Sequence, residues 1–393
     1  MSTPASRPVS ESPSRPEEQS LDDWTTGRLD DSIRPTWAEI DLGAFARNID
    51  AIVAGLPSGT RLIALLKANA YGHGAVELAR RCSPDKVAMI GVALLEEALQ
   101  LRDAGITLPI LVLGPLSATQ IVTALERDVT LGVPGPEELE LVAAIARDRD
   151  VAIHLKLDSG MGRMGVVETE LPRVVELLQS APRLRVDAIY THFANASDPR
   201  DPFTEYQVAR FNTLLETLKQ AAITAPKHHS ANSAATVRGI APGDFVRTGI
   251  ALYGAEPLDV DSPRLEPVMR WRTAIARLKE LPPGHAVGYG TTFITKRASL
   301  IATLPIGYAD GYNRRLSNRG EVLVRGQRAP VVGRVSMDLV TIDVTDVAGA
   351  ALGDEVVLLG DGLTAEELAA KLDTISYEVF CNVGARVPRV YRS

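Results

Sequence analysis

The sequence predicts an α/β domain built on a parallel sheet, followed by a smaller and mostly antiparallel β domain. Two observations lead to this prediction. From about Arg34 to Gly254, short apolar runs alternate with stretches of helical periodicity, which is typical of parallel strands joined by crossover helices. After about Pro267, strand-like runs follow one another with only turns between them, which indicates antiparallel pairing. A chain of 393 residues, 45% of them hydrophobic, is long enough for two or three domains.

In the first domain, five short aliphatic runs predict strands at 61–66, 87–92, 109–113, 151–157 and 186–190. Helices are predicted at 74–82, 94–103, 118–128, 137–148, 171–180 and 204–222. The alternation covers about 220 residues, which is near the size of one (β/α)8 barrel of the TIM type. A doubly wound sheet would show the same periodicity, so the alternation by itself leaves both folds open.

In the second domain, strands are predicted at 272–278, 299–305, 321–325, 329–335 and 339–344. Turn sequences such as Pro282-Pro283-Gly284 and Asn318-Arg319-Gly320 separate them. One short helix is expected at 364–371, after Asp361-Gly362. The second domain is therefore expected to be a mostly antiparallel β domain.

The first 31 residues differ from the rest of the chain. They include six Ser, four Pro, seven acidic and three basic residues, and few apolar ones. Such a segment cannot bury enough surface to offset its ordering entropy, so we expect a disordered tail; a partner-binding tail is the less favoured alternative. The expected division is a tail at 1–33, a first domain at 34–268 and a second at 269–393.

Charge and composition argue against several classes of function. The chain has 42 basic and 49 acidic side chains, a net charge of −7, whereas a general nucleic-acid binder would show a basic excess. Cys82 and Cys381 cannot form a disulfide framework and fit a reducing compartment. The sequence contains no run of 18 apolar residues and no signal-peptide pattern. We therefore expect a cytoplasmic protein that spans no membrane.

Common catalytic motifs are absent or weak. None of the six histidines lies in an H-E-x-x-H motif or a Cys/His cluster, so no metal site is expected. Nucleophile-elbow and P-loop motifs are also missing. Residues 160–165 match G-x-G-x-x-G, but the match lies in the middle of the chain after a strand that ends in charged residues. A flexible loop is the favoured interpretation.

Lys67 follows the predicted strand at 61–66. In a barrel, the C-terminal end of a strand faces the catalytic mouth. Partial burial would make Lys67 a Schiff-base nucleophile, although spacing alone fits a solvated rim lysine better. Other polar groups follow later strand ends and would surround the same mouth: Lys156, Arg163, Thr191, His192, His229, Asn232, Ser233, Arg247, Gly249 and Ile250. Together they indicate an anion-binding site.

A series of ordered motifs extends from Thr36 to Tyr391. They are Trp37-Ala-Glu-Ile-Asp41-Leu, Lys67-Ala-Asn-Ala-Tyr-Gly-His-Gly74, His154-Leu-Lys156-Leu-Asp158-Ser-Gly-Met-Gly-Arg163, Thr191-His192-Phe-Ala, Ala231-Asn-Ser233-Ala, Val246-Arg247-Thr-Gly249-Ile250, Gly288-Tyr289-Gly290, Pro305-Ile-Gly-Tyr308-Ala-Asp310-Gly, Gly333-Arg334-Val-Ser-Met337-Asp338 and Arg386-Val-Pro388-Arg389. With these motifs the sequence resembles the bacterial alanine racemases. The resemblance implies a (β/α)8 barrel that binds pyridoxal 5'-phosphate (PLP), a C-terminal β domain and a head-to-tail homodimer.

The resemblance implies catalytic roles for four residues. Lys67 would hold PLP covalently and act as one acid/base group, and Tyr289 of the partner subunit would act as the second. Two groups are needed because inversion removes a proton from one face of the substrate Cα and returns one to the other. Arg247 would face the pyridine nitrogen and keep it unprotonated, because a guanidinium does not release its proton. His192 would hydrogen-bond to the catalytic tyrosine, and His229 would support Arg247.

The other implied roles concern binding. The cofactor would also be held by Tyr71, Asn232, Ser233, Gly249, Ile250 and Tyr377. Arg163 would contact the PLP phenolic oxygen and the substrate carboxylate, and Met337 of the partner subunit would complete the carboxylate site. Lys156 aligns with a lysine that is often carbamylated in this family. Asp310 is interpreted as a turn or gate residue.

The expected function is interconversion of L-alanine and D-alanine, which would supply D-alanine for peptidoglycan. A racemase of broader specificity and a PLP-dependent amino-acid decarboxylase of the same architecture are the alternatives. Decarboxylation needs no second catalytic base, so Gly288-Tyr289-Gly290 and Arg163 favour racemisation. A non-enzymatic PLP carrier would have only the barrel, so the C-terminal domain argues against it.

Overall fold

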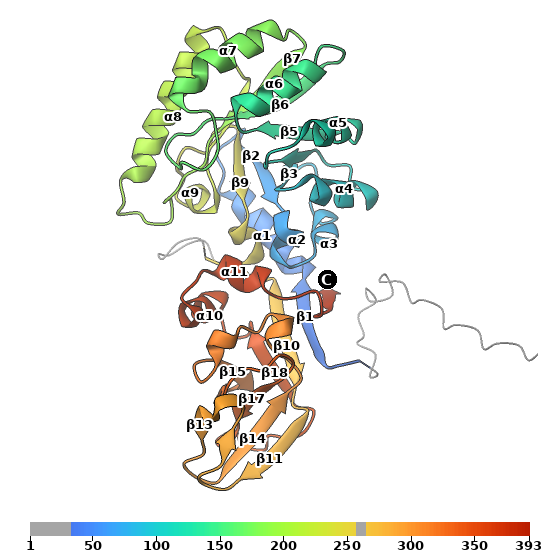
Figure 1. Ribbon diagram of the computed structural model, residues 1–393, viewed down its shortest axis with the longest axis vertical. Coiled ribbons are helices and arrows are strands. Elements are labelled where there is room, and N and C mark those ends of the chain that lie inside the picture. Colours follow the sequence, from blue (N-terminus) through green and yellow to red (C-terminus); the bar gives the residue numbers. More distant parts are fainter. Residues whose placement is uncertain (1–32, 257–264) are drawn as a thin grey trace, which may run out of the picture.

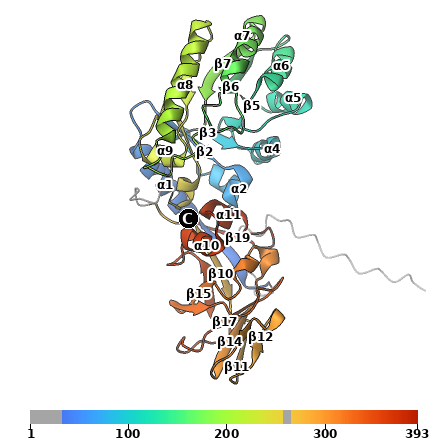
Figure 2. The same ribbon diagram turned by 60° about the vertical axis from the view of Figure 1, so that its left-hand side comes forward.

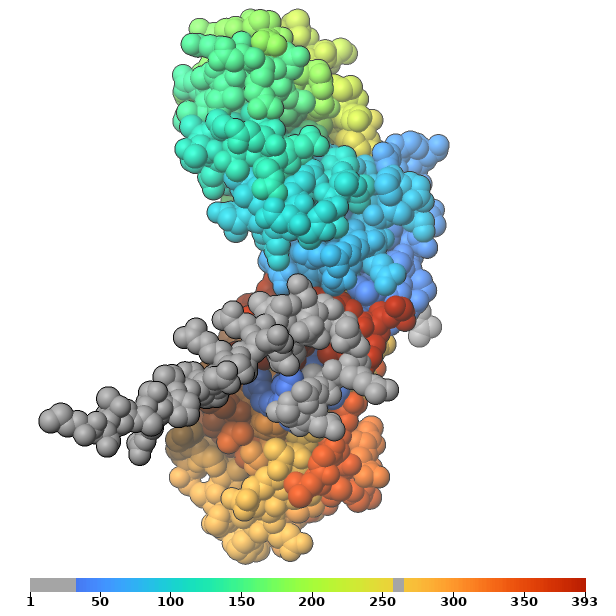
Figure 3. All heavy atoms as spheres, turned by 90° about the vertical axis from the view of Figure 1, so that its right-hand side faces the viewer, coloured from blue at the N-terminus to red at the C-terminus, as the bar shows by residue number. Residues whose placement is uncertain are grey.

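A computed structural model describes residues 33–256 and 265–393. Apart from Ile33, the predicted tail at 1–33 lies outside the described residues. Figure 1 shows two lobes stacked along the long axis, an α/β lobe above and a β-rich lobe below. The space-filling view shows the same two lobes from the side (Figure 3). In the described part of the chain, no helix is long and apolar enough to cross a membrane.

The upper lobe contains an eight-stranded parallel sheet in the order β8-β7-β6-β5-β4-β3-β2-β9. The terminal strands β8 and β9 approach each other: the Asp244 amide donates to the His228 carbonyl and the Arg247 amide to the Ala231 carbonyl, both at 2.9 Å. The sheet is therefore a nearly closed barrel, and the predicted fold class is confirmed over the doubly wound alternative. The strands are β2 (Arg61–Leu65), β3 (Val87–Val92), β4 (Ile110–Val112), β5 (Val129–Val133), β6 (Val151–Lys156), β7 (Leu184–Tyr190), β8 (Lys227–His229) and β9 (Phe245–Thr248).

Helices cover the outside of these strands (Figures 1 and 2). A strand such as β3 is therefore buried at every position, as expected for a parallel strand covered on both faces. The helices of this lobe are α1 (Leu42–Ala54), α2 (Lys67–Tyr71), α3 (Ala75–Ala79), α4 (Leu95–Asp103), α5 (Ala118–Glu126), α6 (Pro136–Ile145), α7 (Leu171–Ser180), α8 (Phe203–Gln220) and α9 (Ser233–Val237).

The lower lobe contains a six-stranded sheet in the order β16-β15-β18-β10-β1-β19, a three-stranded sheet β11-β14-β17 and the hairpin β12-β13. Two helices, α10 (Ala365–Leu372) and α11 (Ser376–Cys381), lie where this lobe meets the barrel (Figure 1). The strands are β1 (Thr36–Asp41), β10 (Met269–Ala274), β11 (Arg277–Leu281), β12 (Ala286–Val287), β13 (Phe293–Ile294), β14 (Ser299–Leu304), β15 (Glu321–Val324), β16 (Gln327–Pro330), β17 (Val340–Asp343), β18 (Glu355–Leu359) and β19 (Arg389–Arg392).

Strand β1 joins the two lobes. Residues 36–41, which the predicted boundaries place with the barrel, pair antiparallel with β10 and parallel with β19 in the lower sheet. The buried hydroxyls of Thr36 and Thr273 share a hydrogen bond of 2.8 Å across this pairing. The described chain therefore starts in the lower lobe, builds the barrel and returns, so its first and last strands lie side by side in one sheet.

Candidate active site

Lys67 lies directly after β2, at the start of a left-handed turn. Residues 68–71 all have φ near +52°, a conformation that costs about 1–2 kcal/mol for each residue with a side chain. Hydrogen bonds hold the turn: the Ala70 amide donates to the Leu66 carbonyl at 2.8 Å, and the Asn69 side chain accepts from the Ala75 amide at 2.8 Å. Strain that is retained in this way is typical of functional sites, and here it fixes the direction of the chain after the lysine.

Several cations lie in the region of Lys67 and Lys156. Burial lowers the pKa of Lys67, and the nearby charge of Arg163 lowers it further. Burial, Arg163 and Arg247 likewise lower the pKa of Lys156 to about 8. The pKa of His192 lies well below its usual value because the ring is buried beside Arg247 and these other cations. The site therefore combines several cations with a neutral imidazole, which favours an anionic ligand.

Arg247, on β9, is fully buried and held by several acceptors. Its guanidinium donates to the Thr191 carbonyl at 2.6 Å and to the Ser230 carbonyl at 3.0 Å. It also lies 2.6 Å from Nδ1 of His229 and 3.3 Å from Nδ1 of His192. Burial lowers its pKa to about 10, so the guanidinium remains charged at neutral pH. The structure thus brings the predicted His229–Arg247 pair together.

The contacts of Arg247 define the protonation of two buried histidines. Because an arginine can only donate, Nδ1 of His229 must accept, and the proton of this neutral ring lies on Nε2. That Nε2 lies 3.0 Å from Nδ1 of His154, which then accepts in turn. Burial lowers the pKa of His154 to about 4, so this ring is also neutral. Sequence reasoning assigned no role to His154; its position two residues before Lys156 on one strand face was the available signal.

A cradle of hydroxyl groups and backbone lies next to the left-handed turn. The Gly249 amide donates to Ser233 Oγ at 2.9 Å, which leaves the serine hydroxyl free to donate to a ligand. A Cβ at Gly249 would overlap the Tyr71 hydroxyl, so glycine is required at this close approach. The Tyr71 and Tyr377 rings lie 5.8 Å apart. Burial raises the pKa of both tyrosines, that of Tyr377 to about 12, so both hydroxyls remain donors.

Two further predicted cofactor residues shape this cradle. The Asn232 side chain caps α9 by accepting from the Ala235 amide at 3.1 Å, and it donates to the Phe193 carbonyl at 3.3 Å. Ile250 is fully buried at the start of a short 3-10 turn after Gly249. Asn232 therefore positions the neighbouring Ser233 through the helix start, and Ile250 anchors the chain after β9.

Arg163 lies in the loop after β6. The Asp158 carboxylate accepts from the amides of Gly160 and Gly162 at 2.8 and 2.9 Å, which shapes the glycine-containing loop. The Arg163 side chain is exposed but acts on the pKa of Lys67, Lys156 and His192 through its charge. The loop thus brings a cation to the edge of the site.

Tyr289 and Met337 do not lie with this group in a single chain. Tyr289 begins the turn between β12 and β13, and its side chain is 70% exposed. Met337, just before β17, is 53% exposed. Figures 1 and 2 place β12, β13 and β17 in the lower lobe, away from α2, which begins at Lys67. A site that contains all predicted residues therefore needs a second copy of the chain.

The fold and the geometry together define a class: a two-lobed barrel enzyme with a strand-end lysine, an arginine held by neutral histidines and a hydroxyl-lined anion cradle. Residues 40–257 match the family model for the alanine racemase N-terminal domain, and residues 268–391 match that for the C-terminal domain. The chain belongs to the alanine racemase family. It is therefore an isomerase of a PLP-dependent family with a barrel fold, as the sequence predicts.

Known relatives match most of the chain. The alanine racemase of Halothermothrix orenii is 41% identical over 369 residues, which covers 92% of this chain and 97% of the relative. The structure of alanine racemase from Bacillus anthracis with bound L-Ala-P has a TM-score of 0.86 and 39% identity, covering 92% and 96% of the two chains. That of alanine racemase from Bartonella henselae with covalently bound pyridoxal phosphate has a TM-score of 0.85 and 28% identity, covering 92% and 100%.

Proposed function

We propose that this protein interconverts L-alanine and D-alanine with PLP as its cofactor, and that Lys67 and Tyr289 of the partner subunit are its two acid/base groups. The observation that carries the proposal is the partly buried Lys67 after β2, whose pKa is lowered first by burial and then by the charge of Arg163. The family membership and the relatives with bound L-Ala-P and pyridoxal phosphate support the same substrate and cofactor.

The residues of this site fit PLP. A dianionic phosphate suits the cradle of Tyr71, Ser233, Gly249 and Tyr377, where hydroxyl groups can donate and a Cβ would leave no room. Lys67 would hold the carbonyl carbon of the cofactor, because a lysine with a lowered pKa is more often present as the neutral nucleophile. When bound, PLP withdraws electrons from the Cα of an attached amino acid and makes its Cα proton acidic.

Side chains of this protein would carry out the proton transfers and hold the substrate. Lys67 would exchange a proton with one face of Cα and Tyr289 of the partner subunit with the other face, since one group cannot reach both. His192 would hydrogen-bond to that tyrosine. Arg247, which stays charged with a pKa of about 10, would donate toward the pyridine nitrogen and keep a proton off it. Arg163 and Met337 of the partner subunit would hold the substrate carboxylate.

The proposal includes a homodimer with shared sites, because the lysine and the tyrosine lie in different lobes of one chain. It places the reaction in the cytoplasm, where Cys82 and Cys381, both free thiols, would stay reduced. Supply of D-alanine for peptidoglycan is the expected use of the product. Lys156 would be carbamylated and would orient Arg163.

The test is a panel of L-amino acids incubated with the purified holoenzyme, with product chirality and CO2 release measured together. We expect rapid formation of D-alanine and much slower inversion of larger side chains. Comparable rates across the panel would instead show a racemase of broad specificity. Release of CO2 with formation of an amine would show a decarboxylase, and bound PLP without turnover of any amino acid would show a carrier.

A further inference from the structure

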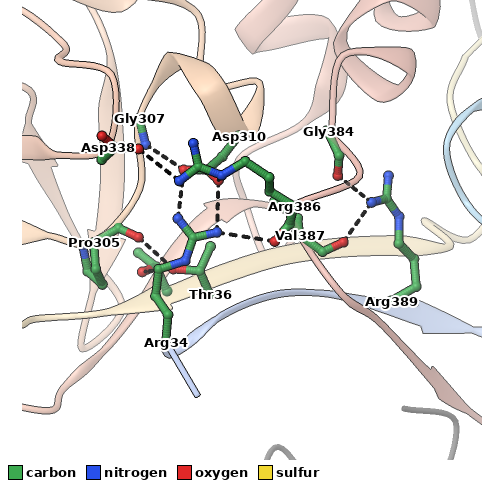
Figure 4. Close-up of polar contacts among 11 residues, drawn as sticks. Arg34, Thr36, Pro305, Gly307, Asp310, Asp338, Gly384, Arg386, Val387 and Arg389 are labelled. Atoms are coloured by element: carbon green, nitrogen blue, oxygen red, sulfur yellow. Dashed lines mark hydrogen bonds and ion pairs between the residues drawn. The ribbon is translucent and has the colours of Figure 1, made fainter. Parts of the chain in front are cut away.

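Asp310, in the lower lobe, is a buried carboxylate with three hydrogen-bond donors and one further ion pair. Arg34 binds it in bidentate fashion, with two hydrogen bonds of 2.8 Å. Arg386 Nε lies 3.3 Å from Oδ1, and the Gly307 amide donates to Oδ2 at 3.0 Å. The carboxylate is 0% exposed, whereas the two arginines remain partly exposed. Figure 4 shows both guanidinium groups converging on this one carboxylate.

These residues come from distant parts of the chain. Arg34 precedes β1, Asp310 follows β14 and Arg386 precedes β19, and Arg34 also donates to the Arg386 carbonyl at 3.2 Å. A buried carboxylate is costly unless it is well paired, and removing one partner weakens the whole arrangement. We call Arg34, Asp310 and Arg386 the arginine–aspartate cluster.

The loop that carries Asp310 packs directly against the segment that carries Met337. The Tyr308 amide donates to the Ser336 carbonyl at 3.0 Å, and the Ala309 amide donates to the Met337 carbonyl at 3.0 Å. A Cβ at Gly307 would overlap the Met337 backbone, so the two backbones are in close contact. Any movement of the Asp310 loop must therefore shift Met337.

The arginine–aspartate cluster also contacts the segment that carries Met337 through the side chain of Arg386. Arg386 Nη2 donates to Asp338 Oδ1 at 2.8 Å, while Arg386 Nε faces Asp310. Arg386 thus links the carboxylates on either side of Met337, and the two arginines and two carboxylates balance in charge. Met337 is held by the Asp310 loop, and Asp338 is held by Arg386 of the C-terminal segment (Figure 4).

We propose that Arg34, Asp310 and Arg386 are positioning residues that fix the Met337–Asp338 segment, and thereby set the affinity of the partner's site for the carboxylate of the amino-acid substrate. The inference rests on the proposed function, in which Met337 completes the carboxylate site of the other subunit. It gives the buried Asp310, interpreted from the sequence as a turn or gate residue, a defined task.

The test replaces Arg34 by methionine, which keeps the length of the side chain but removes the bidentate pair. The matched control is Arg47→Met, which removes another bidentate pair, Arg47–Glu266 at 2.7 and 2.8 Å. A carboxylate contact is made in both the ground state and the transition state, so its loss raises KM and leaves kcat nearly unchanged. We expect the KM for both alanine enantiomers to rise about tenfold in Arg34→Met, with kcat within about twofold.

Two further measurements separate positioning from general damage. Propionate, which has the carboxylate but no amine, should inhibit Arg34→Met more weakly by the same factor as the rise in KM. Hydrogen–deuterium exchange should become faster in a peptide that covers residues 307–311, because the Tyr308 and Ala309 amides lose their fixed acceptors. Arg47→Met should match the wild type in KM, in propionate inhibition and in exchange.

An unchanged KM in Arg34→Met would overturn the inference, and so would a fall in kcat at constant KM. If Arg34→Met does not fold, Arg386→Gln gives the same test, because the Arg386 side chain is 49% exposed and its removal frees Asp338; an unchanged KM there would also overturn it. A wild-type protein that does not racemise alanine would contradict the proposed function, whereas wild-type racemisation with an unaffected variant would contradict only this inference.

Discussion

Lys67 and Lys156 occupy related positions at the ends of β2 and β6, and their environments separate them from a surface lysine. For both, burial is the largest cause of a lowered pKa, and the charge of Arg163 is the next. A lowered pKa increases the fraction of neutral amine, which is the form that attacks a carbonyl carbon or CO2. The structure thus supports a nucleophilic role for each lysine, which the position in the sequence only suggests.

Lys67→Ala should lose the covalent link to the cofactor. In the wild type, borohydride should fix pyridoxal to the peptide that contains Lys67, because reduction converts the carbon–nitrogen double bond to a stable amine. The variant should show no fixed pyridoxal by mass spectrometry, and racemisation should fall below detection. Lys296→Ala, which removes an exposed lysine of the lower lobe, is the control and should be labelled like the wild type. Pyridoxal fixed elsewhere in Lys67→Ala would place the cofactor on another residue.

Carbamylation of Lys156 should increase with pH through about 8. The neutral amine is the form that reacts with CO2, and its fraction grows as the pH rises through the lowered pKa of Lys156. Holoenzyme in 13C-bicarbonate should therefore give a stronger carbamate signal by NMR at pH 9 than at pH 7. Lys156→Arg should give none at either pH. A signal that persists in this variant would assign the modification to another lysine.

At the scale of elements, the cradle depends on close contact between the left-handed turn and the end of β9. Gly249 has a φ of −124°, so glycine is not needed there for a left-handed conformation. The obstacle is the Tyr71 hydroxyl, which a Cβ at this position would overlap. Packing against Tyr71 is therefore a sufficient reason for glycine at this strand end.

Gly249→Ala should weaken binding of PLP without unfolding the protein. The added methyl group must displace Tyr71 from the cradle, and overpacking of this kind costs about 1–3 kcal/mol. The dissociation constant for PLP, measured by absorbance titration of the apoenzyme, should rise about tenfold or more. Gly55→Ala is the control, because its Cβ would meet only ordinary contacts at 3.5 Å or more. Equal affinity in the two variants would exclude this packing role.

The strands of the barrel differ in how well sequence predicts them. The runs at 61–66 and 87–92 correspond to β2 and β3 because a parallel strand buried on both faces is mostly apolar. The run at 151–157 corresponds to β6, although His154 and Lys156 interrupt its apolar residues. Strand β8 is the sequence Lys227-His-His229 and has no apolar run, so pairing with β7 is what makes it a strand. The predicted strand at 272–278 is two strands, β10 and β11, which belong to different sheets.

At the scale of the whole molecule, the separation of Lys67 and Tyr289 is the central observation. Lys67 lies at the barrel mouth, whereas Tyr289 lies on the exposed turn after β12. The proposed pairing of these two groups in one active site requires two copies of the chain. It also means that each subunit would supply the lysine to one site and the tyrosine to the other.

Mixing of two inactive variants should therefore restore activity. When Lys67→Ala and Tyr289→Phe subunits exchange, each heterodimer has one site with both native groups and one site with neither. Racemisation should recover to about one quarter of the wild-type rate for random exchange of equal amounts, because half of the dimers then have one active site of two. Each variant mixed with itself is the control. Absence of recovery after exchange is confirmed by mass spectrometry would contradict a shared site.

The sequence by itself determined the fold class, the family and the residues around Lys67, because apolar periodicity and ordered motifs are local properties of the chain. Only the tertiary structure decided which distant groups meet. It paired β1 with β10 and β19, aligned His154 with His229, and placed Arg34 against Asp310, 276 residues away. A polar side chain can have many partners of suitable chemistry along the chain, and folding selects the one that lies within hydrogen-bond distance once both are buried.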